Sequence, residues 1–261
     1  DGGEVVANYP GYEQLNRYAE NLGAKVHRIR VLDDMSPDFT GLEKAVNQNT
    51  KVINICNPNN PTGTVHGPQA VEGFVRRVMR ESSGTIVHMD EAYINYADPG
   101  AMETALPLAL EFENVFISRS FSKAHGIAGL RVGYALGQEQ TLDAIGGAWG
   151  MGDVNMLGAI AAITALEDEE HIEWERKENA EIRAFTIAAF RDMGYEVADC
   201  HTNHIFVNIR RPASEFRAAC LEQKILVGRD FPPMHNTHCR ISIGSREEME
   251  KAVQVFRHVL A

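Results

Sequence analysis

The first part of the chain alternates short apolar runs with segments whose apolar residues recur every three or four positions. Six runs are rich in valine and isoleucine and predict strands: Val5–Ala7, Lys25–Val31, Val52–Cys56, Thr85–Met89, Val115–Ser118 and Val132–Leu136. The segments between them predict helices: Tyr12–Leu22, Pro68–Glu81 and Gln138–Ala148. Strands that alternate with helices predict a largely parallel sheet with helices on both faces.

The pattern changes near the middle of the chain, where a charged stretch keeps helical periodicity over residues 167–193 and predicts one long linking helix. Beyond it the pattern predicts strands at Tyr195–Ala198, His204–Ile209 and Cys239–Ile243, and helices at Ala213–Gln223 and Glu247–Val259. We therefore expect a large domain over residues 1–167 and a small C-terminal α/β domain over 168–261. Trp149 and Met151 are expected to pack near the domain junction.

Composition narrows the class of protein. The chain has 25 Lys and Arg against 36 Asp and Glu, a net charge of −11 that argues against a nucleic-acid-binding surface. Hydrophobic residues make up 44%, which excludes wholesale disorder, and no apolar run approaches the roughly 20 residues of a membrane span. The four cysteines lie far apart without a CxxC pair, which favours reduced thiols and a cytoplasmic location over a zinc site or a disulfide framework.

The first residues read as a turn, Asp1-Gly2-Gly3-Glu4, that runs straight into the first predicted strand without an initiator methionine. We expect that an upstream segment belongs to the protein, which leaves open whether an export signal precedes it.

Three polar motifs follow predicted strands, the place where open α/β sheets bind ligands, and a fourth leads into the predicted strand Val132–Leu136. They are Asn57-Pro58-Asn59-Asn60-Pro61-Thr62-Gly63, Asp90-Glu91-Ala92-Tyr93, Ser118-Arg119-Ser120-Phe121-Ser122-Lys123 and Gly129-Leu130-Arg131-Val132-Gly133-Tyr134. A lysine with a depressed pKa can bond covalently to a carbonyl, and hydroxyls beside an arginine suit a phosphate. Each motif alone also has a structural interpretation: a turn, a helix cap, a solvated charge and a strand-entry arginine.

Together and in this order, the motifs resemble the pyridoxal-phosphate-dependent aminotransferases of class I/II, the fold type I superfamily, and the histidinol-phosphate aminotransferases most of all. The resemblance covers essentially the whole chain and includes the arginine strand Cys239-Arg240-Ile241-Ser242-Ile243-Gly244. It implies an α/β fold, with a mostly parallel sheet in a large domain and a small C-terminal α/β domain. It also implies pyridoxal 5′-phosphate as cofactor and a homodimer.

The resemblance implies catalytic roles for three residues. Lys123 would hold the cofactor covalently and carry the proton, Asp90 would pair with the protonated pyridine nitrogen, and Tyr93 would hydrogen-bond the ring's 3′-oxygen together with Asn60. Tyr12 would stack on the ring. Three further residues would hold the cofactor phosphate: Ser120, Ser122 and Arg131.

Substrate contacts are implied for Arg240, Arg229 and Asn60. Arg240 would grip the substrate's α-carboxylate or phosphate, and its neighbours Ile241 and Ile243 would face the core. Arg229 follows an expected strand at Ile225–Val227 and would reach the distal group. No metal is implied.

The resemblance thus implies an aminotransferase that acts between an amino acid or a histidinol-phosphate-like amino-alcohol phosphate and a 2-oxo acid such as 2-oxoglutarate, without nucleic-acid or membrane partners. Three alternatives stay open. The first is a pyridoxal-phosphate-dependent decarboxylase or oxidase on the same scaffold, which shares the lysine, aspartate and arginine. The second is a regulatory binding module, which needs a basic DNA-binding segment that the chain does not show. The third is an inactive truncated fragment.

Overall fold

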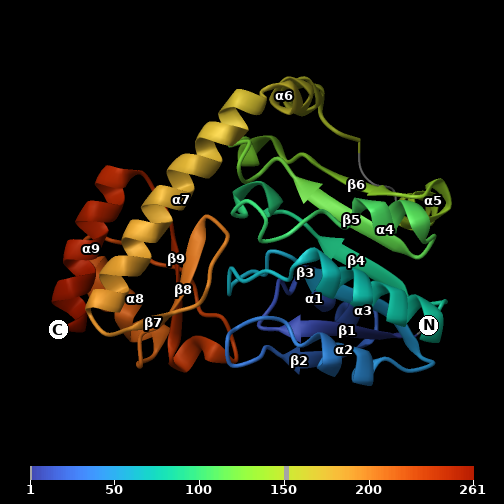
Figure 1. Cartoon of the computed structure of the whole chain (residues 1–261), viewed down its shortest axis with the longest axis horizontal. Coiled ribbons are helices and arrows are strands. Elements are labelled where there is room, and N and C mark those ends of the chain that lie inside the picture. Colours follow the sequence, from blue (N-terminus) through green and yellow to red (C-terminus); the bar gives the residue numbers. More distant parts are fainter. Residues whose placement is uncertain (1, 150–152) are drawn as a thin grey trace.

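The larger of two sheets forms the centre of the N-terminal part of the protein. The structure, a computed structural model, describes residues 2–149 and 153–261 (Figure 1). The sheet has the order β2-β1-β3-β4-β5-β6, and β6 is antiparallel to β5 while the other pairs are parallel. Its strands are β1 (Glu4–Tyr9), β2 (Lys25–Arg30), β3 (Thr50–Cys56), β4 (Ile86–Asp90), β5 (Val115–Ser120) and β6 (Gly133–Gly137).

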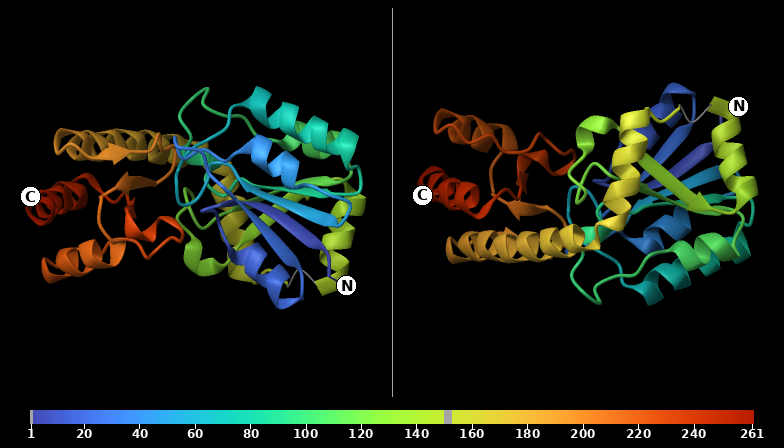
Figure 2. Two further views of the ribbon diagram at one scale, coloured as in Figure 1. Left: turned by 90° about the horizontal axis from the view of Figure 1, so that it is seen from below. Right: turned by 90° about the horizontal axis from the view of Figure 1, so that it is seen from above.

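Helices cover both faces of this sheet (Figure 2). They are α1 (Gln14–Asn21), α2 (Phe39–Ala45), α3 (Pro68–Glu81), α4 (Leu106–Glu111) and α5 (Glu139–Trp149). The bounds of α3 are as predicted; proline occupies its first turn, and Phe74 and Val75 pack with Ile53 of β3 in one buried cluster. On the other face, Asn16 of α1 is hydrogen-bonded to Asn54, the next residue of β3. The expected helix at Tyr12–Leu22 is shorter, because α1 begins at Gln14.

The C-terminal part is built on a smaller antiparallel sheet, β7-β8-β9. Helix α6 (Met156–Glu167) precedes this part, whose elements are α7 (Glu169–Asp192), β7 (Glu196–Val197), β8 (His204–Asn208), α8 (Ala213–Glu222), β9 (His238–Ser242) and α9 (Arg246–Leu260). The predicted long helix corresponds to α7, which runs from α6 to the smaller sheet (Figure 1). Asp168 separates α6 from α7 and caps α7 by accepting a hydrogen bond from the His171 amide.

Three expectations need comment. The prediction of a strand at Ile225–Val227 is wrong, because that segment is irregular. A hydrogen bond of 3.0 Å from the Gly228 amide to the Arg240 carbonyl joins its end to β9. The packing expected for Trp149 and Met151 lies outside the described side chains. No helix in the described ranges is long and apolar enough to cross a membrane.

Candidate active site

A cavity of about 590 Å³ lies where the carboxyl ends of β4 and β5 meet segments from both parts of the chain, within the size range of small-molecule sites. All ten site residues that the sequence predicts line it: Tyr12, Asn60, Asp90, Tyr93, Ser120, Ser122, Lys123, Arg131, Arg229 and Arg240. The structure therefore brings together residues that lie up to 228 positions apart, from Tyr12 to Arg240.

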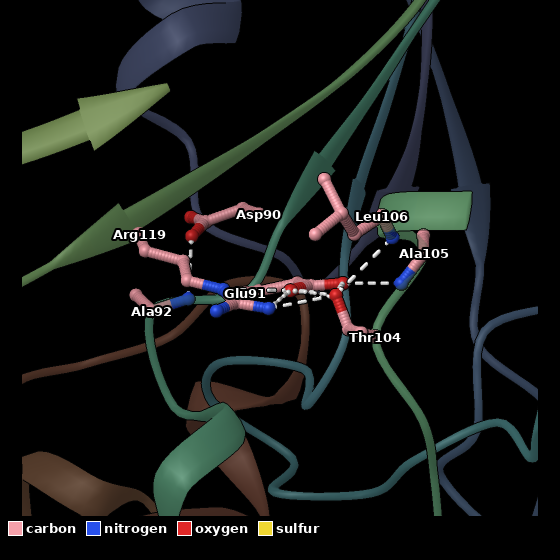
Figure 3. Close-up of polar contacts among 7 residues, drawn as sticks. All are labelled: Asp90, Glu91, Ala92, Thr104, Ala105, Leu106 and Arg119. Atoms are coloured by element: carbon pink, nitrogen blue, oxygen red, sulfur yellow. Dashed lines mark hydrogen bonds and ion pairs between the residues drawn. The ribbon is translucent and has the colours of Figure 1, made fainter. Parts of the chain in front are cut away.

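Asp90 ends β4 and is partly buried. Burial raises the pKa of its carboxyl, and the hydrogen bond from the Ala92 amide, 3.0 Å long, and the charge of Lys123 act in the opposite direction (Figure 3). A carboxylate in this position gains most from a cationic partner inside the cavity, because the opposite charge offsets the cost of desolvation.

Lys123 follows β5 and reaches the cavity with its Nζ 5.1 Å from the centre of the Tyr93 ring. Burial, and then the charge of Arg240, lower the pKa of its amine. Within the described part of the chain, no carboxylate oxygen lies within 4.0 Å of Nζ. A lysine amine with these surroundings becomes neutral at a lower pH than an exposed lysine amine does. A nucleophile or a proton carrier requires this neutral form.

Arg240 of β9 provides a further cation that lines the cavity. Its Nη1 donates to Oδ1 of buried Asn60 at 2.9 Å, while its buried Nε has no hydrogen-bond partner among the described residues. Ile241, the next residue, lies in the core, as the alternation in the sequence predicted. A buried guanidinium with an unused donor is suited to an anionic group.

Phe231 lies beside two of the arginines that line the cavity, Arg229 and Arg240, and sequence reasoning missed it. The guanidinium of Arg229 is 4.2 Å from the centre of its ring and that of Arg240 is 4.9 Å away. Such cation–π contacts hold the two cations near one buried aromatic ring. The sequence did contain a signal for Phe231, because Arg229 and Phe231 lie two positions apart just after an apolar run.

Three further residues that line the cavity offer anion donors. Ser120 Oγ accepts from the Ser122 amide at 3.0 Å, which leaves the hydroxyl proton of Ser120 available. Arg131 has a left-handed backbone conformation (φ 57°, ψ 47°) and its Nη1 donates to the Ala128 carbonyl. Non-glycine residues in this conformation cluster at functional sites, because the surrounding structure must offset the strain.

A row of hydrogen-bonded polar side chains crosses the face of the sheet and ends in the cavity. Because the carboxylate of Glu13 can only accept, Asn16 donates to it at 3.1 Å and Asn54 donates to Asn16 at 3.2 Å. His88 Nδ1 must then donate to Asn54 Oδ1 at 2.9 Å, and His88 Nε2 accepts from the Ser118 hydroxyl at 2.8 Å. Ser118 lines the cavity, and its hydroxyl proton is already donated to His88.

The comparisons with known proteins agree with this geometry. The chain is 30% identical over 261 residues to the histidinol-phosphate aminotransferase of Moorella thermoacetica, covering 100% of this chain and 67% of that protein. It is 32% identical over 261 residues to that of Bacillus subtilis strain 168, covering 100% and 71%. The crystal structure of histidinol-phosphate aminotransferase from Sinorhizobium meliloti in complex with pyridoxal-5′-phosphate superposes with a TM-score of 0.88 at 26% identity, covering 99% of this chain and 70% of that one.

The family model described as aminotransferase class I and II matches residues 1–256. Because this match spans almost the whole chain and both parts of the cavity, the chain belongs to the class I and II aminotransferases.

Proposed function

We propose that this protein transfers an amino group from a histidinol-phosphate-like amino-alcohol phosphate, or from an amino acid, to a 2-oxo acid such as 2-oxoglutarate. The observation that carries the proposal is the convergence of Lys123, Asp90 and Arg240 on one cavity. The names of the relatives from Moorella and Bacillus support the choice of amino donor.

The residues of the cavity fit pyridoxal 5′-phosphate, the cofactor of this family. Asp90 is a desolvated carboxylate that gains from a cationic ring nitrogen, and Lys123 is an amine with a lowered pKa and no carboxylate partner among the described residues. When bound, the cofactor supplies an electron sink for the substrate's amino carbon.

We assign the following roles to the chain's own residues. Asp90 keeps the ring nitrogen protonated, Lys123 holds the cofactor covalently and moves the proton, and Tyr93 and Asn60 hydrogen-bond the ring's 3′-oxygen. Tyr12, exposed at the mouth of the cavity, covers the ring face.

Anionic groups are held at two places in this proposal. Ser120, Ser122 and Arg131 bind the cofactor phosphate, and Arg240 binds the anionic group of the substrate through its unused Nε. Arg229 lies at the rim and selects for a second charge or a phosphate on the donor.

The test is product analysis with purified protein, cofactor and L-histidinol phosphate, with and without 2-oxoglutarate. The proposal predicts stoichiometric glutamate that appears only when 2-oxoglutarate is present. Release of hydrogen peroxide without glutamate would contradict it and would identify an oxidase, and release of carbon dioxide from an amino acid supplied in place of histidinol phosphate would identify a decarboxylase.

We infer that the protein works as a homodimer. Support comes from α6, whose apolar side chains are exposed, including Met156, Leu157, Ile160 and Ile163. Apolar patches of this kind mark contact surfaces. Sedimentation equilibrium at micromolar concentration is the measurement, and a monomer throughout would contradict the inference.

We also propose a division into domains at residues 167/168 and a location in the cytoplasm. Two separate buried clusters support the division, one around Ile53 and Phe74 and the other around Phe206 and Phe256. The four buried, unpaired cysteines support a reducing compartment.

A further inference from the structure

Glu91, the residue that follows Asp90, is a buried carboxylate that the proposed chemistry does not use. Its side chain is 2% exposed and contacts different neighbours from those of Asp90 (Figure 3). Neither Glu91 nor Thr104, which it contacts, is among the described residues that line the cavity. A buried charge persists only where donors satisfy it, so the surroundings of Glu91 need an explanation.

Four donors surround the two oxygens of Glu91. Arg119 donates to Oε2 through Nε at 3.0 Å and Nη2 at 2.9 Å, and the Ala105 amide donates to Oε1 at 2.6 Å. The Thr104 hydroxyl accepts from Arg119 Nη2 at 2.7 Å and from the Leu106 amide at 3.1 Å, so its proton is given to Glu91. Both carboxylate oxygens of Glu91 and the Thr104 hydroxyl therefore have hydrogen-bond partners (Figure 3).

This network joins the ends of the two strands that carry the reacting groups. The Glu91 amide also donates to the Ser118 carbonyl at 2.9 Å, so Glu91 is tied to β5 by both its backbone and its side chain. Arg119 lies in β5 between Ser118 and Ser120, four residues before Lys123. Movement of Glu91 relative to Arg119 would therefore change the distance between Asp90 and Lys123.

Stability alone does not explain a buried ion pair, because replacing such a pair by apolar side chains of similar size is often neutral or stabilising. We propose that Glu91, Arg119 and Thr104 are positioning residues that hold Asp90 in its productive place relative to Lys123 during transamination. This inference rests on the role proposed above for Asp90. A misplacement of about 1 Å at a reacting centre can reduce a rate about 100-fold.

The experiment separates positioning from folding. Glu91→Gln leaves Arg119 without its charge partner, and we expect its Tm to fall by roughly 6 °C or more. In the double variant Glu91→Leu/Arg119→Met, the expected Tm returns to within about 3 °C of the unchanged protein, because no charge is left unpaired. Despite this recovery in Tm, we expect the kcat of the double variant to stay about 100-fold below that of the unchanged protein, with KM changed less than about threefold. We also expect a shift in the pH midpoint of the bound cofactor's absorbance.

Thr104→Val provides a second test at a residue that, unlike Arg119, is not among the described residues that line the cavity. It removes one donor, so we expect a folded protein with kcat lowered about tenfold and a smaller shift of the same spectroscopic midpoint. The matched control is Arg77→Met/Glu43→Leu, which removes an ion pair of 2.7 Å on the surface between α3 and α2 and leaves kcat and the midpoint unchanged.

Wild-type kcat and midpoint in both the double variant and Thr104→Val would overturn the proposal and leave the network a structural one. Asp90→Asn, measured alongside, separates this failure from failure of the proposed function. If Asp90→Asn loses activity while the network variants do not, only the positioning inference is wrong. If Asp90→Asn is fully active, the role of Asp90 is wrong and the positioning inference is wrong with it.

Discussion

His88 makes the stability of the protein depend on pH. Burial lowers the pKa of its imidazole from 6.5 to about 4, so between these values the unfolded chain binds a proton that the folded chain does not. Acidification through this window therefore favours unfolding. At 1.36 kcal/mol per pKa unit, the contribution of His88 to folding falls by about 2 kcal/mol at pH 5 and by about 3 kcal/mol below pH 4.

Urea unfolding at about pH 7.5 and about pH 5 measures this effect. Burial also lowers the pKa of His238 to about 4, so the quantity to compare is the loss of unfolding free energy in wild type against His88→Gln. We expect the wild type to lose about 2 kcal/mol more than the variant. His258→Gln, which changes an exposed histidine in α9, should lose as much as wild type. Equal losses in wild type and His88→Gln would refute the reasoning.

Four other substitutions test the site and its surroundings. Asp90→Asn should retain bound cofactor, measured by absorbance after gel filtration, while kcat falls at least about 100-fold, and near-normal turnover would show that Asp90 only stabilises the turn through the Ala92 amide. Arg240→Lys should lower kcat/KM for every amino donor, whereas Arg229→Ala should lower it about tenfold or more for phosphorylated or acidic donors only. Equal losses for neutral donors would make Arg229 structural. Arg183→Met should destabilise the protein by about 1–3 kcal/mol in urea, because the Tyr96 and Thr202 carbonyls lose a buried donor, and a loss below about 0.5 kcal/mol would contradict that.

Sequence reasoning was sufficient where the physical signal is local. The alternation of apolar runs predicted all six strands of the larger sheet, and the spacing of Val71, Phe74, Val75 and Val78 predicted α3 with its bounds. The family, the fold type I class, the transaminase activity and the cofactor are confirmed by the family match and by the Sinorhizobium structure.

Other features needed the fold. Helix α6 is apolar on all sides and therefore has no periodicity to detect, and α2 and α4 are too short to show one. The strand expected at Ile225–Val227 has the right composition, but only one amide hydrogen bond joins its end to β9. The pairing of Glu91 with Arg119 depends on the register of β4 against β5, which no local pattern contains.

The central claim is that Lys123 carries the cofactor in this cavity. The direct measurement is borohydride reduction of the protein with bound pyridoxal 5′-phosphate, followed by digestion and mass spectrometry of the labelled peptide. Because Lys123 combines a lowered pKa with a place in the cavity beside Asp90 and Arg240, the account predicts a single labelled lysine, Lys123, and no label in Lys123→Ala. A cofactor label on any other lysine, or an unchanged label in Lys123→Ala, would contradict the account.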